Sequence, residues 1–335
     1  MDDLLRRVFG SGASRRHPLE DDDSGLPTTQ NIPPAQKPTP VESKVLAIIH
    51  NPIVTRDGRK IKDVYGWNDP DQLAADYARD IEVISHGYAH YRIVERIEVD
   101  AFPVKVDGFR YNAQSFAMAW RTRQFHKPDD VDYLALVREF KLIEKIDAGI
   151  IDEVWLLGFP ACGYYESIMA GPEAFWCNAP PLKGTQHAAR RFVIMGFNYE
   201  RGVGEMLEDL GHRAESIMKQ VFADQRGEAN LWERFCRYDK TDRGRAEVGN
   251  VHFAPNSVKD YDWGNQSRVL SRCDTWRRFP DLSGEPRLVN CADWGNGDIR
   301  KHHHWWFSLF PHIIGESNRL SWNWWEYVID PNRVR

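Results

Sequence analysis

The 335-residue chain has little cysteine and no long apolar run. Its five cysteines are an odd number without C-x-x-C spacing, which argues against a dense disulfide framework and a cysteine-rich structural zinc site. One bridge stays open, between Cys273 and Cys291, which flank a loop that contains proline and glycine. Because no run of about 18 apolar residues is present and the first residues lack an apolar core, we expect neither a membrane span nor a secretory signal.

Glycine-rich phosphate loops and basic blocks are absent as well. G-x-G-x-x-G does not follow the first apolar run, and Gly202-x-Gly204 lacks the third glycine, so we expect no nucleotide cofactor. The net charge of -5 and the lack of a lysine or arginine block argue against nucleic acid as the main partner. These features fit a cytoplasmic protein and equally one exported by a non-classical route.

The composition divides the chain into a tail and one folded domain. Residues 1–43 are rich in Pro, Ser, Asp and Gln and poor in aliphatic side chains, which predicts a disordered tail. Residues 44–335 are expected to form a single α/β domain. In its core, residues 44–224, short apolar strands alternate with capped helices, the pattern of a doubly wound, mostly parallel sheet. The loop-rich remainder, 225–335, holds nine of the thirteen tryptophans and is expected to pack on the sheet and form part of a pocket.

The clearest secondary-structure unit lies at residues 191–223. An apolar run from Phe192 to Met195 predicts a buried strand, and a polar turn leads from it into a segment of helical period. Elsewhere we expect strands at 45–49, 91–99 and 153–157, a helix that begins after Asp69 and ends by Gly87, and a helix capped by Asp129 or Asp130 that ends at Gly149.

Candidate catalytic residues follow the predicted strands, because open α/β sheets bind ligands beyond the carboxyl ends of their strands. Glu166, Asn198, Glu200 and Arg201 stand there. Burial of Glu166 among tyrosines would raise its pKa toward that of a general acid or base, and the alternative is a carboxylate that stabilises a helix N-terminus. Asn198 and Arg201 would orient a substrate. Cys162 is either a nucleophilic thiol or, more in keeping with the neighbouring letters, a packed one.

Candidate metal ligands lie further along the chain. His212-x-x-Glu215 is a weak ligand pattern for zinc or another divalent metal. One histidine of the run 302–304, such as His303, would add a ligand, and His252 or Asp298 could join it.

The helical period offers a simpler interpretation of the same residues. If the helix continues through Gly211, then Glu205, Glu208, His212 and Glu215 share one face, as in an ordinary solvated helix. A helix end at Gly211 would favour the metal interpretation instead. A continuous helix would also place His212 roughly 20 Å from Asn198, so the two candidate sites would not cooperate.

Five strings of the sequence resemble a bacterial protein family with no assigned reaction. They are GFNYERGVGEMLEDLGHRAES, GNVHFAPNS, ADWGNGDIRKHHHWWF, FRYNAQSF and YYESIMAGPEAFWCN. The resemblance spans most of residues 45–330 and gives no residue a catalytic role. Secretion of such relatives implies that this protein can act outside the cytoplasm.

Together the residues predict a hydrolase, metal-assisted, that acts on an amide or glycosidic bond of a peptide or glycan polymer. Two alternatives belong to other classes. A non-catalytic carbohydrate-binding or adhesive module would use exposed tryptophans as stacking platforms. An exported effector would use the N-terminal tail for delivery.

Overall fold

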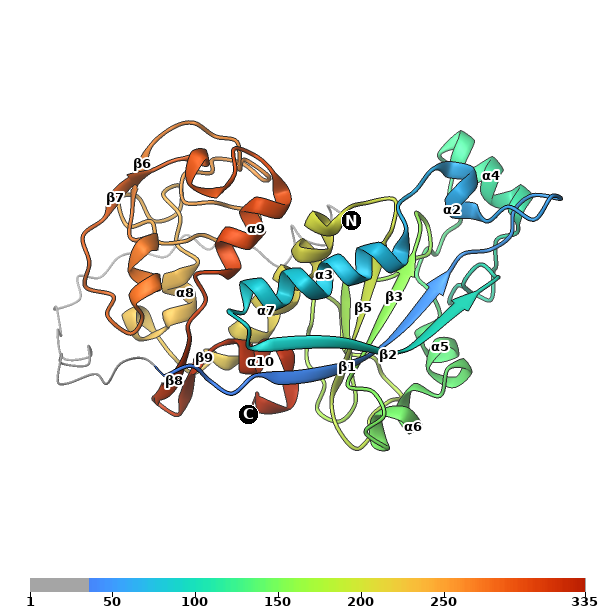
Figure 1. Cartoon of the computed structure of the whole chain (residues 1–335), viewed down its shortest axis with the longest axis horizontal. Coiled ribbons are helices and arrows are strands. Elements are labelled where there is room, and N and C mark those ends of the chain that lie inside the picture. The colour runs from blue at the N-terminus through green and yellow to red at the C-terminus, as the bar shows by residue number, and fades with distance from the viewer. Residues whose placement is uncertain (1–35, 335) are drawn as a thin grey trace. The chain divides into compact units, whose positions relative to one another are not determined.

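The computed structural model describes residues 36–334 (Figure 1). Residues 1–35, most of the tail predicted to be disordered, lie outside the described residues. Strand β1 (Val41–His50) begins inside the predicted tail, so the folded part starts before residue 44.

The central sheet has five strands in the order β2-β1-β3-β5-β4. The first four in that order are parallel, and β4 pairs with β5 in the antiparallel sense. The bounds are β2 (Ala89–Val99), β3 (Glu153–Gly158), β4 (Ser167–Ala170) and β5 (Phe192–Asn198). The prediction of an α/β protein with a mostly parallel sheet is confirmed.

The buried parts of the inner strands are mostly apolar because both of their faces are covered. In β1, Val45 and Ile49 point into one hydrophobic cluster and Leu46 into another, as the period of two in a strand requires. Helices α3 (Pro70–Ile84) and α7 (Val203–Val221) contribute to the first cluster. Helices α5 (Tyr133–Glu139) and α6 (Leu142–Asp147) contribute to the second.

Local signals explain where most of these helices begin and end. The Asp69 side chain accepts hydrogen bonds from two backbone N–H groups of α3, as predicted. The single helix predicted up to Gly149 is two helices, because Lys141 between them has a left-handed backbone with φ 52°. Its N-terminal cap is Asp132 and not Asp129 or Asp130. Two further helices precede it, α2 (Ile61–Tyr65) and α4 (Ala113–Thr122).

The C-terminal region combines short helices, two hairpins and long loops. Its elements are α8 (Leu231–Phe235), β6 (Val269–Ser271), β7 (Arg287–Val289), α9 (Ile299–Phe307), β8 (His312–Ser317), β9 (Leu320–Asn323) and α10 (Trp325–Ile329), with 3₁₀ turns at Gly227–Ala229, Cys273–Arg278, Cys291–Trp294 and Pro331–Arg333. Most of its tryptophans are buried in one aromatic core and do not line a surface, for example Trp276, Trp306 and Trp324. The expected pocket walls are therefore largely interior packing.

The crevice at the carboxyl ends of β1 and β3, where the strand order reverses, is the usual ligand site of such sheets. Here aromatic side chains fill it. Trp67 stacks on Phe159 with ring centroids 5.9 Å apart, and the Tyr199 hydroxyl donates to the His50 carbonyl at 2.9 Å. A cavity of about 20 Å³ beside His50 has room for little more than a water molecule. This cavity is too small for a substrate.

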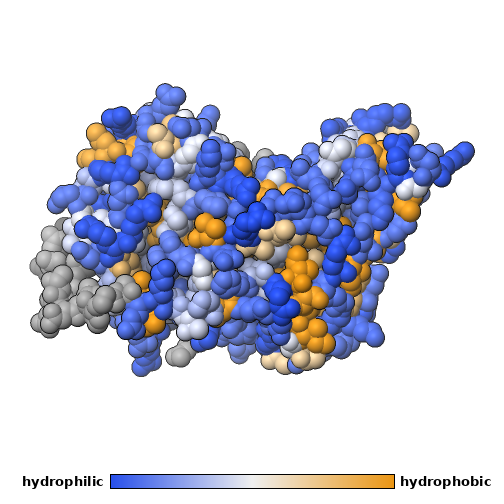
Figure 2. Space-filling model, viewed as in Figure 1, coloured by the Kyte–Doolittle hydropathy of each residue, from blue (hydrophilic) through white to orange (hydrophobic). Residues whose placement is uncertain are grey.

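Hydrophilic residues predominate on the face drawn in Figure 2, and hydrophobic ones form small patches. None of the helices between residues 36 and 334 combines the length and apolar character needed to cross a bilayer.

Candidate metal centre

The polar face of α7 carries Glu208, His212 and Glu215 at helical spacing. The helix continues unbroken through Gly211, the case in which we expected a solvated face. Instead the Glu208 and His212 side chains are only 12% and 15% exposed. The face is half-buried because other parts of the chain cover it.

One cover is the loop at residues 249–253, which lies directly on α7. A Cβ atom on Gly211 would stand 2.4 Å from Val251 Cγ2, so only glycine permits this approach. The Val251 N–H donates to Glu215 Oε1 at 3.0 Å, and Asn250 Oδ1 accepts from the N–H of His252 at 3.1 Å. These contacts hold His252 above the helix.

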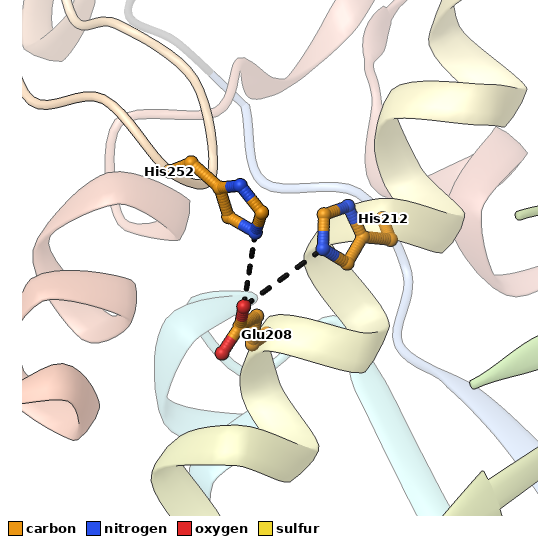
Figure 3. Close-up of side chains that lie close together, drawn as sticks. All are labelled: Glu208, His212 and His252. Carbon is orange, nitrogen blue, oxygen red and sulfur yellow. Dashed lines mark hydrogen bonds and ion pairs between the residues drawn. The ribbon is translucent and has the colours of Figure 1, made fainter. Parts of the chain in front are cut away.

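The two histidines converge on one carboxylate (Figure 3). His252 Nε2 lies 3.0 Å and His212 Nε2 3.9 Å from the same oxygen, Glu208 Oε1. The ligand atoms of the three residues all lie within 4.8 Å of one another. One ion could contact all three.

A second carboxylate stands behind each ring. His212 Nδ1 lies 3.5 Å from Glu215 Oε2, and His252 Nδ1 lies 3.5 Å from Asp260 Oδ1. A divalent ion that takes the Nε2 positions would leave each Nδ1–H bonded to its own carboxylate, the usual arrangement of metal-bound histidine. Glu215, predicted as a ligand, is placed to orient His212.

Glu166 joins this group, although we expected the catalytic and metal candidates to lie apart. Its Oε2 is 3.9 Å from His212 Nε2 and accepts a hydrogen bond from the Asn178 side chain. The Asn178 backbone N–H in turn donates to Ser216 Oγ of α7 at 3.0 Å. Glu166 precedes the antiparallel strand β4, which places it beside the middle of α7 and away from the helix N-terminus.

Helix α9 lies along α7 on another side of the cluster. A Cβ atom on Gly204 would stand 2.5 Å from Ile299 Cγ2, and one on Gly211 would stand 3.8 Å from Trp306 Cζ3. Residues 299–306 therefore run beside residues 204–211.

This alignment sets His303 level with Glu208. His303 Nδ1 is 2.8 Å from the Ile299 carbonyl oxygen, which can only accept, so Nδ1 carries the hydrogen. Burial lowers the pKa of His303 to about 4, so its ring is neutral at pH 7 and Nε2 has a free lone pair. That atom is buried and has no hydrogen-bond partner among the described residues.

Negative charge exceeds positive charge in the cluster. Among residues 36–334, no lysine or arginine lies within ion-pair distance of the carboxylates of Glu166, Glu208, Glu215 and Asp260. Burial acts to lower the pKa of His212, but hydrogen bonding to Glu215 and the surrounding carboxylates outweigh it and raise that pKa to about 9. Burial raises the pKa of Glu208, yet the hydrogen bond from His252 and the nearby histidines bring it below its usual value. The site favours a cation.

Asn198, Glu200 and Arg201 stay outside this cluster. They lie at the end of β5 and in the turn that follows it, where Asn198 Oδ1 accepts from the Glu200 N–H at 3.0 Å. The Arg201 side chain is 61% exposed and faces Glu205. Within the described residues, no hydrogen bond or ion pair joins the three to Glu166 or His212.

Cys162 is a packed thiol. It is buried and accepts a hydrogen bond from the Phe159 N–H at 3.3 Å, and burial raises its pKa to about 12. A nucleophilic thiol needs the opposite shift. All five cysteines are free, Cys273 and Cys291 included.

Sequence reasoning missed the backing role of Asp260 and the support that Asn178 gives to Glu166. It also treated Glu208 as a solvated residue, although the Glu208-x-x-x-His212 spacing, which sets two ligand types on one helix face, was a usable signal. Comparisons of the chain with protein-family models, with curated proteins and with solved structures found no match.

Proposed function

We propose that the protein is a metal-dependent hydrolase whose zinc, or similar divalent ion, binds to Glu208, His212 and His252. The observation that carries the proposal is the convergence of two histidine Nε2 atoms on one carboxylate oxygen, each ring backed at Nδ1 by a further carboxylate. Two histidines and a glutamate are a donor set of catalytic zinc sites, which keep a coordination position open for water or substrate.

The proposal adds His303 as a further ligand, although it lies outside the three residues whose ligand atoms fall within 4.8 Å of one another. Its buried Nε2 has a lone pair and no partner, and its Nδ1–H is fixed by a backbone carbonyl, as in many metal-bound histidines.

Glu166 is the general base and acid in this proposal. Its carboxylate stands at the edge of the ligand group, 3.9 Å from His212 Nε2, and the Asn178 amide holds it there. A bound divalent ion lowers the pKa of a water molecule and polarises a carbonyl group. Glu166 would accept a proton from the attacking water and return it to the leaving nitrogen.

An amide bond is the substrate that suits these groups. Glycosidases act through a pair of carboxyl groups on either side of the bond and need no metal-ligating histidines. The sequence left the cleaved bond open between an amide and a glycosidic bond. The proposal keeps the amide bond of a peptide or glycan polymer.

Metal content tests the proposal. The full chain is stripped with a chelator, reloaded with zinc, dialysed and measured by inductively coupled plasma mass spectrometry. We expect about one zinc per chain in the wild type and a loss in His252→Ala, whose loop position makes a folding defect small. His90→Ala is the matched control, because His90 is an exposed histidine of β2 outside the cluster. A metal-free wild type, or equal zinc in both variants, would reject the proposal.

A further inference from the structure

Tyr261 stands at the cluster in an unusual conformation. Its backbone is left-handed with φ 58°, which a bulky side chain rarely adopts, and the residue is 55% exposed. Such strain persists only when the surroundings hold it.

The surroundings of Tyr261 are parts of the site. Its ring packs on His252 with centroids 4.5 Å apart and meets Trp263 edge to face at 5.3 Å. The same Trp263 ring lies edge to face on His303 at 5.3 Å. Asp260, the residue before Tyr261, backs His252.

The loop that carries Tyr261 is tied down at both ends. Asp262 Oδ2 accepts from the Val258 N–H at 3.0 Å and from the Asn265 side chain at 2.9 Å. The Trp294 indole N–H donates to the Trp263 carbonyl at 2.9 Å. The tyrosine is thus fixed over the histidines and leaves its other side to solvent.

The phenol is a hydrogen-bond donor at neutral pH. A tyrosine hydroxyl keeps its proton at pH 7 and can donate it in a hydrogen bond. Because its ring packs on His252, Tyr261 stands next to any ion that His252 binds.

We propose that Tyr261 is a further catalytic residue, whose hydroxyl donates a hydrogen bond to the oxyanion formed when water adds to the amide carbonyl. The inference rests on the proposed metal-dependent hydrolase. A preorganised donor aimed at developing negative charge is among the most effective devices in catalysis.

The hydrolysis runs in two steps. The water oxygen forms a bond to the carbonyl carbon, its proton passes to Glu166, and the carbonyl π pair moves to oxygen and creates the oxyanion. That pair then re-forms the carbonyl, the carbon–nitrogen bond breaks with its electrons on nitrogen, and Glu166 gives the proton to that nitrogen. Tyr261 keeps its proton throughout.

The test measures oxyanion binding without a known substrate. The probe is acetohydroxamate, a small acyl compound that presents an oxyanion to a bound metal, titrated calorimetrically into the zinc-loaded full chain. Wild type, Tyr261→Phe and Tyr238→Phe are compared after the zinc content of each has been measured. Tyr238 is the matched control, since its ring stacks on Phe253 in the neighbouring part of the chain.

We expect Tyr261→Phe to bind acetohydroxamate roughly 10- to 100-fold more weakly, the value of one hydrogen bond to a charged group, with unchanged zinc content. Tyr238→Phe should behave as wild type. Equal affinity in Tyr261→Phe overturns the inference, and so does a zinc-loaded wild type that binds no hydroxamate. Loss of zinc in Tyr261→Phe would give the hydroxyl a structural role and also overturn it. A wild type without zinc is the separate failure of the proposed function, and the inference falls with it.

Discussion

His252 Nε2 lies 3.0 Å from Glu208 Oε1, although 44 residues separate them along the chain. His252 is on a loop, and Glu208 is in helix α7. The contact depends on the glycine at position 211, where the loop touches the helix.

Replacing that glycine should empty the metal site without touching a ligand. In Gly211→Ala the added methyl group would meet Val251 at 2.4 Å, so the loop with His252 must shift. We expect zinc content to fall severalfold and the free energy of unfolding to drop by about 1–2 kcal/mol, the cost of overpacking less the helix preference of alanine. Metal analysis measures the zinc content, and urea unfolding measures the free energy of unfolding.

Gly202→Ala is the control for that variant. Its new Cβ would stand 3.5 Å from Glu205, an ordinary contact. If Gly211→Ala kept zinc as well as Gly202→Ala does, the loop would not be positioned by this contact.

The residue after His212 anchors α7 to the sheet through a buried ion pair. Arg213 Nη1 donates to Glu153 Oε2 at 2.7 Å, and neither side chain is more than 3% exposed. Arg213→Met should cost about 3–5 kcal/mol, because it leaves the Glu153 charge buried without a cation. The double variant Glu153→Leu, Arg213→Met should lose less free energy of unfolding than Arg213→Met alone, measured by urea unfolding. A double variant less stable than the single one would show that the charge is not the reason.

His50 gives the protein a pH dependence on the acidic side. Burial, with a smaller effect of Arg110, lowers the pKa of His50 to about 4, against about 6.5 in the unfolded chain. As the pH falls, the unfolded chain therefore binds a proton on His50 before the folded protein does. The stabilisation that neutral, buried His50 provides is complete above pH 6.5 and is lost as the pH falls through about 4. It amounts to about 3 kcal/mol at most.

Urea unfolding between pH 7 and pH 4 tests this contribution. The difference in free energy of unfolding between wild type and His50→Gln should shrink as the pH falls. The exposed His187→Gln should show no such trend. A difference that is constant with pH would mean that His50 stabilises the fold by packing alone.

The β5–α7 unit could be predicted because strand, turn and helix each leave a local signal: an apolar run, polar residues and helical period. For the same reason the α/β class and the Asp69 cap are confirmed. The break at Lys141 left no such signal, because a lysine rarely has a left-handed backbone.

The site was harder to predict because its parts meet through packing of distant segments. The strand-end argument pointed to Asn198 and Arg201, but aromatic residues from the insert around Trp67 close the crevice between β1 and β3. The approach of His252 depends on the Val251 contact with Gly211, and the sequence alone does not state which loop lies against which helix.

The environment of a bound zinc ion tests the proposed donor set most directly. X-ray absorption at the zinc edge of the reloaded full chain should show nitrogen and oxygen ligands at about 2.0–2.2 Å, with the outer-shell scattering of at least two imidazole rings. With zinc added in excess of the weakened site's need, His252→Ala should show one imidazole ring fewer. Sulfur ligands near 2.3 Å, a shell of oxygen alone, or an unchanged spectrum in His252→Ala would contradict a centre built from Glu208, His212 and His252.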